Sequence, residues 1–375
     1  MEGAFAFLVH PRDITDIYRP YPFFKYLPSK LVLALVRLLP PIRLSKIEGI
    51  RRASDGTPLD GYLLSIVLGP EHMNNRRGLA LAQKRIAQEV ALAEKLGVER
   101  VGLGALIPSL TRQGKDLVPE GSSPYLTPSV TTGHTLTAWT IGRYLERLIQ
   151  HRDRHVSSVT VAIVGAAGST GSLTAKILAR KKAFGRTGLC LLLIDLKAKK
   201  EMLNKLVEDL GRINPSVPAS ISTDLHDLQK VDYAVTVTNA PGAVVRPQHV
   251  SKGLVIVDDS QPRNTSPELV ACGVTVIDVL SKVPGLQCNF DFGFIIKDPE
   301  ITFTCLAETV LLASQEHQGH FSLGYVELPL VDELERLLES GAVKDAPFHS
   351  FTRELSADEV KALLAPRKVQ MATAV

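Results

Sequence analysis

One stretch, residues 159–195, constrains the fold of this 375-residue chain more than any other. It opens with an apolar strand, VTVAIVG, passes Gly165, Gly168 and Gly171 at GxxGxxG spacing, and enters SLTAKILARK, which has helical periodicity. Glycines suit this turn because it is tight and a pyrophosphate must approach bare backbone, while the helix N-terminus supplies N–H groups and a positive dipole end. The stretch predicts the first half of a Rossmann-type unit that binds a dinucleotide, with an ordinary tight turn as the alternative.

A second apolar strand, LCLLLIDLK, ends at Asp195, where an acidic residue accepts hydrogen bonds from the adenosine ribose of NAD. Lys197, followed by Lys199 and Lys200, could instead hold the 2′-phosphate of NADP. The sequence therefore leaves NADH and NADPH equally open as the cofactor. The predicted cofactor-binding residues are Gly165, Ala166, Gly168, Ser169, Thr170, Gly171, Asp195, Lys197, Thr238, Asn239 and Ala240.

The last three of these residues follow a later strand, VDYAVTVTNAP, which precedes two more, GLVIVDDSQP and GVTVIDVL. Strands that alternate with helices predict a parallel sheet, and ligands bind outside the carboxyl ends of its strands. Thr238, Asn239 and Ala240, together with Asp259 and Ser260, are therefore expected to face the nicotinamide. Plain loop chemistry is the alternative for all five residues.

The length and the pattern of elements favour an α/β protein: a doubly wound Rossmann-type sheet preceded by a smaller α/β N-terminal substrate domain and followed by C-terminal helices. We place the substrate domain at residues 1–155, the Rossmann domain at 156–285 and the helical segment at 286–375. The basic run HRDRH before the Rossmann domain is predicted to be a solvated linker. In the first domain, an Asp55-Gly56 turn predicts a hairpin, and residues 78–96 predict an amphipathic helix.

Composition excludes some functions. The net charge of +4 is small and its bases are scattered, which argues against nucleic acid as a partner. The four cysteines show no CxxC metal-ligand spacing, and the N-terminus lacks the pattern of a signal peptide, so a cytoplasmic location is expected.

An apolar run from Leu31 to Leu39 is too short to span a bilayer, which takes about 20 residues. A buried helix that ends at Pro40 is slightly favoured. The run could also line a channel for an acyl chain or make peripheral contact with a membrane surface, with bases at the head groups: Lys25, Lys30, Arg37 and Arg43.

Two further segments carry candidate chemistry. SVTTGHTLTA places several threonines and His134 at a helix N-terminus, either as caps, which spacing favours, or as a polar mouth for an anion or carbonyl oxygen. In ITFTCLAETVLL, Cys305 stands in the first turn of an apolar helix, where the helix dipole favours a nucleophilic thiolate. A buried, inert thiol is the equally weighted alternative. Cys288 is a weaker rival to Cys305, and Cys190 and Cys272 are poorer candidates still.

Several motifs in order resemble the bacterial long-chain acyl-(acyl carrier protein) reductases, best known from cyanobacteria: TTGHTLTA, VAIVGAAGSTGS, VTVTNAPGAVV, IVDDSQPRN and FTCLAETVLL followed by HFSLGY. The resemblance covers most of the chain and fades over roughly the last fifty residues. It implies reduction of an acyl thioester to a fatty aldehyde by NADPH or NADH, through an acyl-enzyme on Cys305. It also implies acyl carrier protein or acyl-CoA as the donor, and an aldehyde-consuming enzyme downstream.

Two departures from that family bear on the cofactor and the loop. Its cyanobacterial members generally use NADPH and carry a basic residue where this chain has Asp195, and the order of histidine and threonine around His134 differs. His134 therefore receives no catalytic role from the resemblance. The alternatives are an oxidoreductase like shikimate dehydrogenase that acts on a hydroxyl group, and a non-catalytic module that binds nucleotide and acyl chains. A third, glutamyl-tRNA reductase, is disfavoured because the first domain contains no cysteine.

Overall fold

The computed structural model describes residues 3–118, 128–181, 187–240, 242–289 and 297–366. The chain forms two compact units, and each is built from two separate stretches of sequence. Unit 1 comprises residues 1–136 and 280–346, and unit 2 comprises residues 137–279 and 347–375. These bounds differ from the three predicted segments, because most of the C-terminal segment folds with the N-terminal residues.

Unit 1 is organised around a six-stranded sheet. Its central strands β3, β1, β4 and β5 run parallel, and β2 pairs antiparallel with β3 as the predicted hairpin. In sheet order the strands are β13 (Gln287–Cys288), β2 (Ile42–Glu48), β3 (Gly61–Ser65), β1 (Ala4–Val9), β4 (Val98–Leu103) and β5 (Ser129–Thr131). A smaller sheet joins β14 (Ile301–Phe303), β12 (Leu280–Lys282) and β15 (Lys344–Asp345).

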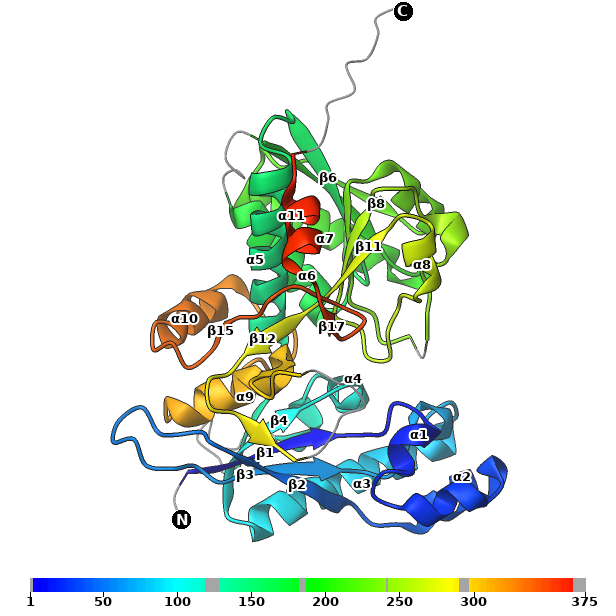
Figure 1. Cartoon of the computed structure of the whole chain (residues 1–375), viewed down its shortest axis with the longest axis vertical. Coiled ribbons are helices and arrows are strands. Elements are labelled where there is room, and N and C mark those ends of the chain that lie inside the picture. The colour runs from blue at the N-terminus through cyan, green and yellow to red at the C-terminus, as the bar shows by residue number, and fades with distance from the viewer. Residues whose placement is uncertain (1–2, 119–127, 182–186, 241, 290–296, 367–375) are drawn as a thin grey trace, which may run out of the picture. The chain divides into compact units, whose positions relative to one another are not determined.

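Helices cover both faces of the larger sheet of unit 1. The amphipathic helix α3 (Arg76–Lys95) buries Ala82, Ile86 and Ala93 against alternate residues of β1 and its neighbours. Helix α9 (Thr304–Ser314) packs on β1 and β4, as Figure 1 shows. Gly102 of β4 permits this approach, since a Cβ there would overlap the side chain of Thr309. The remaining helices are α1 (Ile14–Ile17), α2 (Ser29–Leu35), α4 (Ile107–Leu110) and α10 (Leu328–Leu338).

Unit 2 contains the predicted Rossmann sheet, whose six strands are all parallel. Their order matches the dinucleotide-binding arrangement, in which the third, second and first strands precede the fourth, fifth and sixth. From edge to edge they are β8 (Ala219–Ser222), β7 (Gly188–Ile194), β6 (Ser158–Val164), β9 (Tyr233–Thr236), β10 (Val255–Asp258) and β11 (Thr275–Asp278). The predicted fold class is confirmed.

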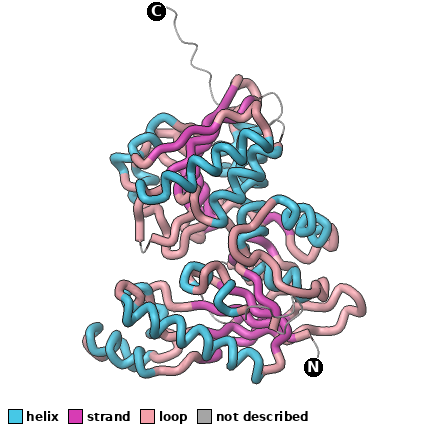
Figure 2. Tube along the Cα trace, turned by 180° about the vertical axis from the view of Figure 1, so that it is seen from behind, coloured by secondary structure: helices cyan, strands magenta, loops and turns pink. Residues whose placement is uncertain are grey.

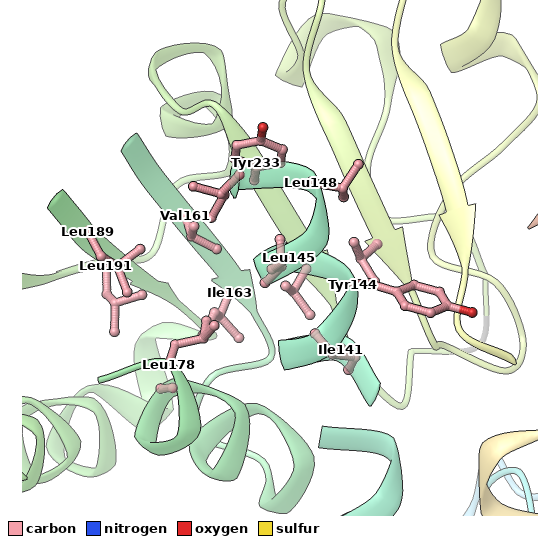
Figure 3. Packing of buried hydrophobic residues seen from close by; sticks show 14 of the residues in the cluster. Ile141, Tyr144, Leu145, Leu148, Val161, Ile163, Leu178, Leu189, Leu191 and Tyr233 are labelled. Carbon is pink, nitrogen blue, oxygen red and sulfur yellow. The ribbon is translucent and has the colours of Figure 1, made fainter. Parts of the chain in front are cut away.

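Successive residues of β6 point into two different cores, because side chains alternate across a strand. Val161 and Ile163 lie in the core that includes Leu145 of α5 and Leu178 of α6, as Figure 3 shows, whereas Ala162 lies in the core on the opposite face. Figure 2 shows the helices of unit 2 against its strands. They are α5 (His134–Arg152), α6 (Ser169–Arg180), α7 (Lys200–Ile213), α8 (Glu268–Ala271) and α11 (Ala357–Leu364). Unit 2 holds α5 from Thr137 onward. A two-stranded sheet pairs β16 (His349–Ser350) with β17 (Arg353–Glu354).

Two features bear on the sequence predictions. The run HRDRH is not simply a solvated linker: Asp153 within it is buried and accepts a hydrogen bond from the hydroxyl of Tyr233. The side chain of Asp153 is thus anchored inside unit 2. Within the described residues, no helix combines the length and the apolar character needed to cross a bilayer.

Candidate functional site

The glycine turn of unit 2 has the backbone that phosphate binding requires. Gly165 follows β6 with φ of +92°, and a Cβ there would lie 2.6 Å from the carbonyl oxygen of Val237. A Cβ at Gly171 would overlap the carbonyl oxygen of Gly165, so only glycine lets α6 pack this closely on the turn. Gly168 is the N-cap of α6 and has no side chain to offer the first-turn N–H groups. The helix N-terminus, with Ser169 and Thr170 in its first turn, therefore fits a pyrophosphate.

Asp195 follows β7 directly and lies against the glycine turn. One carboxylate oxygen accepts the Ala167 N–H at 2.9 Å, and the other accepts the Leu196 N–H at 2.8 Å. Each oxygen retains a second lone pair with which it could accept from a ribose hydroxyl. Asp195 therefore also ties β7 to the turn, a role that the sequence analysis missed. Lys197 lies just beyond, in an exposed turn of 3₁₀-helix.

Thr238, Asn239 and Ala240 follow β9 at the carboxyl edge of the same sheet, as predicted from the strand pattern. Thr238 donates its hydroxyl proton to Asn264 Oδ1 at 2.6 Å and accepts the Ala240 N–H at 3.1 Å. Asn264, which is fully buried, also accepts from the Ser260 hydroxyl at 2.7 Å. No sequence pattern singles out Asn264, although this residue ends the motif IVDDSQPRN.

Asp258 is the last residue of β10 at this edge, and Asp259 follows it directly. Asp258 is buried and accepts from Thr236, Thr265 and the Ser260 N–H. Burial raises the pKa of Asp258, and burial together with the neighbouring Asp258 raises the pKa of Asp259 well above its usual range. Two carboxyl groups this close resist being ionised at the same time. The carboxyl edge of the sheet therefore carries less negative charge than two ionised aspartates would give it.

In unit 1, Cys305 is the second residue of α9 and is half-buried. Every other residue of this helix, from Thr304 to Ser314, is buried. A thiol in a first helical turn feels the positive end of the dipole, which favours the thiolate. Cys305 is thus the half-buried residue at the start of an otherwise buried helix.

The turn between β5 and α5 packs directly on this cysteine. Gly133 has φ of +78°, and a Cβ on it would overlap both Cβ and Cα of Cys305. Only glycine fits at position 133, because its backbone is left-handed and because Cys305 occupies the space that a side chain would fill. The motif TTGHT and the motif FTC, which lie far apart in the sequence, therefore meet at Gly133 and Cys305.

Glu308, one turn after Cys305 on α9, holds this turn in place. Its carboxylate accepts from the Thr131 hydroxyl, from the Gly133 N–H at 3.1 Å and from the Leu136 N–H at 2.8 Å. It is fully buried, and desolvation raises its pKa above the usual range. Glu308 was not predicted as a site residue, although a lone carboxylate in the apolar run LAETVLLA is a sequence signal for a buried, functional acid.

The threonines of this turn do not act as the helix caps that spacing favoured. Thr131 bonds to Glu308, whereas Thr132 and Thr135 bond to the backbone and side chain of Ser322, and all three threonines are buried. Their hydroxyls fasten the turn to later parts of unit 1, and Glu308 caps α5 instead. Burial lowers the pKa of His134 to about 4, so its imidazole is neutral at pH 7, and its Nδ1 has no hydrogen-bond partner.

The other cysteines occupy ordinary structural positions. Cys190 lies within β7, Cys272 ends α8 and Cys288 lies in the edge strand β13. Among the described residues, no group of three or more His, Cys, Asp or Glu side chains is arranged to hold a metal ion.

Comparison with known proteins gives distant similarities. No family model matches the chain. The chain is 25% identical to the long-chain acyl-[acyl-carrier-protein] reductase of Synechococcus elongatus over 300 residues, which cover 77% of this chain and 82% of that relative. It is also 25% identical to aminotransferase PigE of a Serratia species over 339 residues, which cover 86% of this chain. The match spans only 36% of the aminotransferase, so that relative is a much longer protein.

Among solved structures, quinate dehydrogenase from Corynebacterium glutamicum in complex with NAD aligns with 90% of this chain and 98% of its own. The identity is 14% and the TM-score is 0.38, so this match adds nothing to the fold described above.

Proposed function

We propose that this protein is an oxidoreductase that uses NADH or NADPH to reduce a long-chain acyl thioester to a fatty aldehyde, by way of an acyl-enzyme on Cys305. The observation that carries the proposal is the setting of Cys305, half-buried in the first turn of a helix whose other residues are all buried. The distant similarity to a long-chain acyl-[acyl-carrier-protein] reductase supports the substrate class. The Rossmann sheet and glycine turn of unit 2 support the cofactor.

In the first step, the Cys305 thiolate attacks the carbonyl carbon of the acyl thioester and the thiol of the carrier leaves. One thioester replaces another of similar energy, so a difficult reduction is divided into two easier steps. The α9 dipole favours the thiolate, and the step therefore requires no paired histidine as a general base.

A reduced nicotinamide, when bound, would supply the hydride that reduces the acyl carbon in the second step. The tetrahedral oxyanion then collapses, the C–S bond breaks, and Cys305 departs as a thiolate while the aldehyde leaves. Fixed N–H donors stabilise such an oxyanion, and Cys305 lies in the first turn of α9, at the positive end of the helix dipole. The threonine hydroxyls are less suitable, since Thr131, Thr132 and Thr135 are already committed to Glu308 and Ser322.

Within unit 2, Gly165, Gly168 and Gly171 would hold the pyrophosphate with Ala166, Ser169 and Thr170, and Thr238, Asn239 and Ala240 would flank the nicotinamide. Asp195 would meet the adenosine ribose, with Lys197 as the alternative contact to a 2′-phosphate. The acyl donor is acyl carrier protein or acyl-CoA, and the aldehyde passes to an aldehyde-consuming enzyme. A cytoplasmic setting agrees with a reaction that needs a reduced thiol.

The decisive experiment mixes the protein with palmitoyl-acyl carrier protein or palmitoyl-CoA without reduced nucleotide and records the intact mass. We expect a palmitoyl adduct that maps to Cys305 and is released as hexadecanal when NADH or NADPH is added. Comparison of the two nucleotides also gives the cofactor preference.

Cys305→Ala should form no adduct and still bind reduced nucleotide, as followed by nicotinamide fluorescence. Cys288→Ala is the matched control and should form the adduct at the wild-type rate. An adduct that persists in Cys305→Ala, or that forms with neither donor in the wild type, contradicts the proposal. The latter result would favour a hydroxyl-acting dehydrogenase or a binding module.

A further inference from the structure

The segment from Pro22 to Leu38 gathers the exposed apolar surface of unit 1. It forms a 3₁₀-helix (Pro22–Tyr26), α2 (Ser29–Leu35) and a second 3₁₀-helix (Val36–Leu38), which lie near the end of the sheet where β1 terminates (Figure 1). Seven large hydrophobic side chains are exposed among the described residues of the whole chain, and four of them belong to this segment: Phe23, Tyr26, Leu31 and Leu38. Tyr26 is 88% exposed and Leu38 is 76% exposed. Apolar side chains grouped in this way usually mark a contact surface.

The opposite side of the segment is already packed within unit 1. Phe24, Val32 and Val36 are buried in one cluster with Ile17 and Val67. The exposed side chains therefore belong to a folded segment, because the other face of the segment is packed within unit 1. Replacing an exposed residue leaves this anchor intact.

The same exposed face is strongly cationic. Between Ile17 and Ile47 the sequence contains six basic residues and no acidic residue. The bases interleaved with the exposed apolar residues are Lys25, Lys30 and Arg37, all of which are exposed. We call the exposed side chains of Phe23, Lys25, Tyr26, Lys30, Leu31, Arg37 and Leu38 the cationic apolar face.

Helix α3 extends this charge. Arg85 donates from Nη2 to the carbonyl oxygen of Arg37 at 3.2 Å, which joins α3 to the end of the segment. From Arg76 to Gln88, α3 carries four basic residues and no acidic one. A hollow of about 240 Å³ lies between the segment and the residues that precede α3. It is lined by Lys30 and Arg37 and also by one acid, Glu71, together with Leu33, Ala34, His72 and Asn75.

We propose that the cationic apolar face docks the protein on an anionic lipid bilayer. Side chains of Phe, Tyr and Leu that alternate with Lys and Arg suit the interface of a membrane, where rings lie at the level of the head groups and bases reach the phosphates. Each base near an anionic leaflet adds attraction, whereas a neutral surface provides none. The inference is independent of the reaction proposed above, because none of these residues belongs to the candidate catalytic or nucleotide sites.

The test is cosedimentation of the full chain with two kinds of vesicle, pure phosphatidylcholine and phosphatidylcholine mixed with phosphatidylglycerol. We expect binding to the mixed vesicles, weakened by added salt, and little binding to the neutral ones. The triple variant Lys25→Gln, Lys30→Gln, Arg37→Gln should lower the affinity for mixed vesicles about a hundredfold, in keeping with the contribution of three bases.

A second variant, Phe23→Ser, Tyr26→Ser, Leu38→Ser, removes apolar side chains and leaves all charges in place. It should also weaken binding at least tenfold, and the residual binding should keep the salt dependence of the wild type, because all charges remain. Leu196→Ser is the matched control, because Leu196 in unit 2 is 72% exposed, close to the exposure of Leu38. The unchanged melting temperature of each variant shows that the fold is retained.

Three outcomes would overturn the proposal. The first is a wild-type protein that does not sediment with mixed vesicles, and the second is an equal loss of binding in Leu196→Ser. The third is a charge variant that binds vesicles normally but has a raised KM for acyl carrier protein or has lost self-association in sedimentation velocity, which would assign the face to an acidic protein or to a second copy of the chain.

Discussion

Two strand-to-helix turns, one in each unit, share a backbone plan and differ in their electrostatics. The turn after β6 in unit 2 and the turn after β5 in unit 1 each follow a parallel strand, each contains a glycine with positive φ, and each leads into a long helix. In both turns a side chain at a glycine would overlap a neighbour. Local geometry alone would assign the two turns the same task.

The difference lies in what meets the helix N-terminus. In unit 2, the N-cap of α6 is a glycine with no side chain to bond the first-turn N–H groups, which suits an external phosphate. In unit 1, the buried carboxylate of Glu308 accepts from N–H groups at the start of α5. A turn of this shape can therefore bind an external anion only where no carboxylate of the protein already occupies it. In unit 1, Glu308 is that carboxylate, and it fixes the backbone of the turn against Cys305.

The largest expected effects come from the glycines that define the two turns. Gly171→Ala should raise the Kd for reduced nucleotide about a hundredfold, near the upper end of the ~1–3 kcal/mol cost of overpacking, and should leave acyl transfer to Cys305 intact. Gly133→Ala should do the reverse, slowing formation of the acyl adduct about a hundredfold with little effect on nucleotide binding. Fluorescence titration and intact-mass kinetics measure the two quantities.

Gly211→Ala is the control for both glycine variants. A Cβ on Gly211, within α7, would meet nothing within 4 Å, so this change should be neutral or slightly stabilising. If Gly133→Ala acylates at the wild-type rate, the close packing of this turn on Cys305 has no part in the reaction.

Glu308→Gln tests whether the buried carboxylate of Glu308 stabilises the turn of unit 1. The amide keeps one acceptor oxygen but turns an NH₂ group toward a backbone N–H, so the free energy of unfolding should fall by about 2–3 kcal/mol, as expected when a buried donor loses a charged partner. Urea denaturation followed by circular dichroism measures this loss. Glu94→Gln, an exposed position on α3, should change the stability by less than about 0.5 kcal/mol. Equal stability of the two variants would mean that Glu308 does not hold the turn.

His134 gives the turn of unit 1 a pH dependence. Its folded pKa of about 4 lies below the unfolded value of 6.5, so the unfolded state binds more protons and stability falls as the pH drops through that interval. Between pH 7 and pH 5 the wild type should lose about 2 kcal/mol more than His134→Gln. Urea midpoints at the two pH values measure the difference, with the exposed His151→Gln as the control. A His134→Gln variant with the pH response of the wild type would show that the imidazole is hydrated.

Asp195→Asn should have the smallest effect. Removing the negative charge removes repulsion of a 2′-phosphate, so the ratio of affinities for NADPH and NADH should shift toward NADPH by about tenfold, or ~1.4 kcal/mol. The amide oxygen can still accept the Ala167 N–H, which should preserve the turn itself. Titration with both nucleotides gives the ratio, and an unchanged ratio would place Asp195 away from the 2′-position.

The two turns also show how far sequence patterns reach. The strand, glycines and helix of the turn of unit 2 could be predicted because they lie with Asp195 within 37 consecutive residues, residues 159–195. The bond from the Ala167 N–H to Asp195 could not be predicted in this way. The glycine of the turn of unit 1 was visible, but its partner Glu308 lies 175 residues away from Gly133, and no local periodicity joins them. The spacing of Thr131, Thr132 and Thr135 around the start of α5 therefore gave the wrong prediction that they cap this helix. The position of Cys305 in a first helical turn was predicted, whereas its contact with Gly133 required the tertiary structure.

The N-terminal sheet of unit 1 and the helix α9 that covers it are also far apart in the sequence, which determines when unit 1 is completed during synthesis. The sheet of unit 1 has its central strands in place once Thr131 has left the ribosome, yet α9, which covers one face, ends at Ser314. All six strands of the Rossmann sheet lie between these two points. We therefore expect the newly made N-terminal sheet to remain half-covered while the strands of the Rossmann sheet are synthesised, and a chain stopped before α9 to leave one face of that sheet exposed and to aggregate.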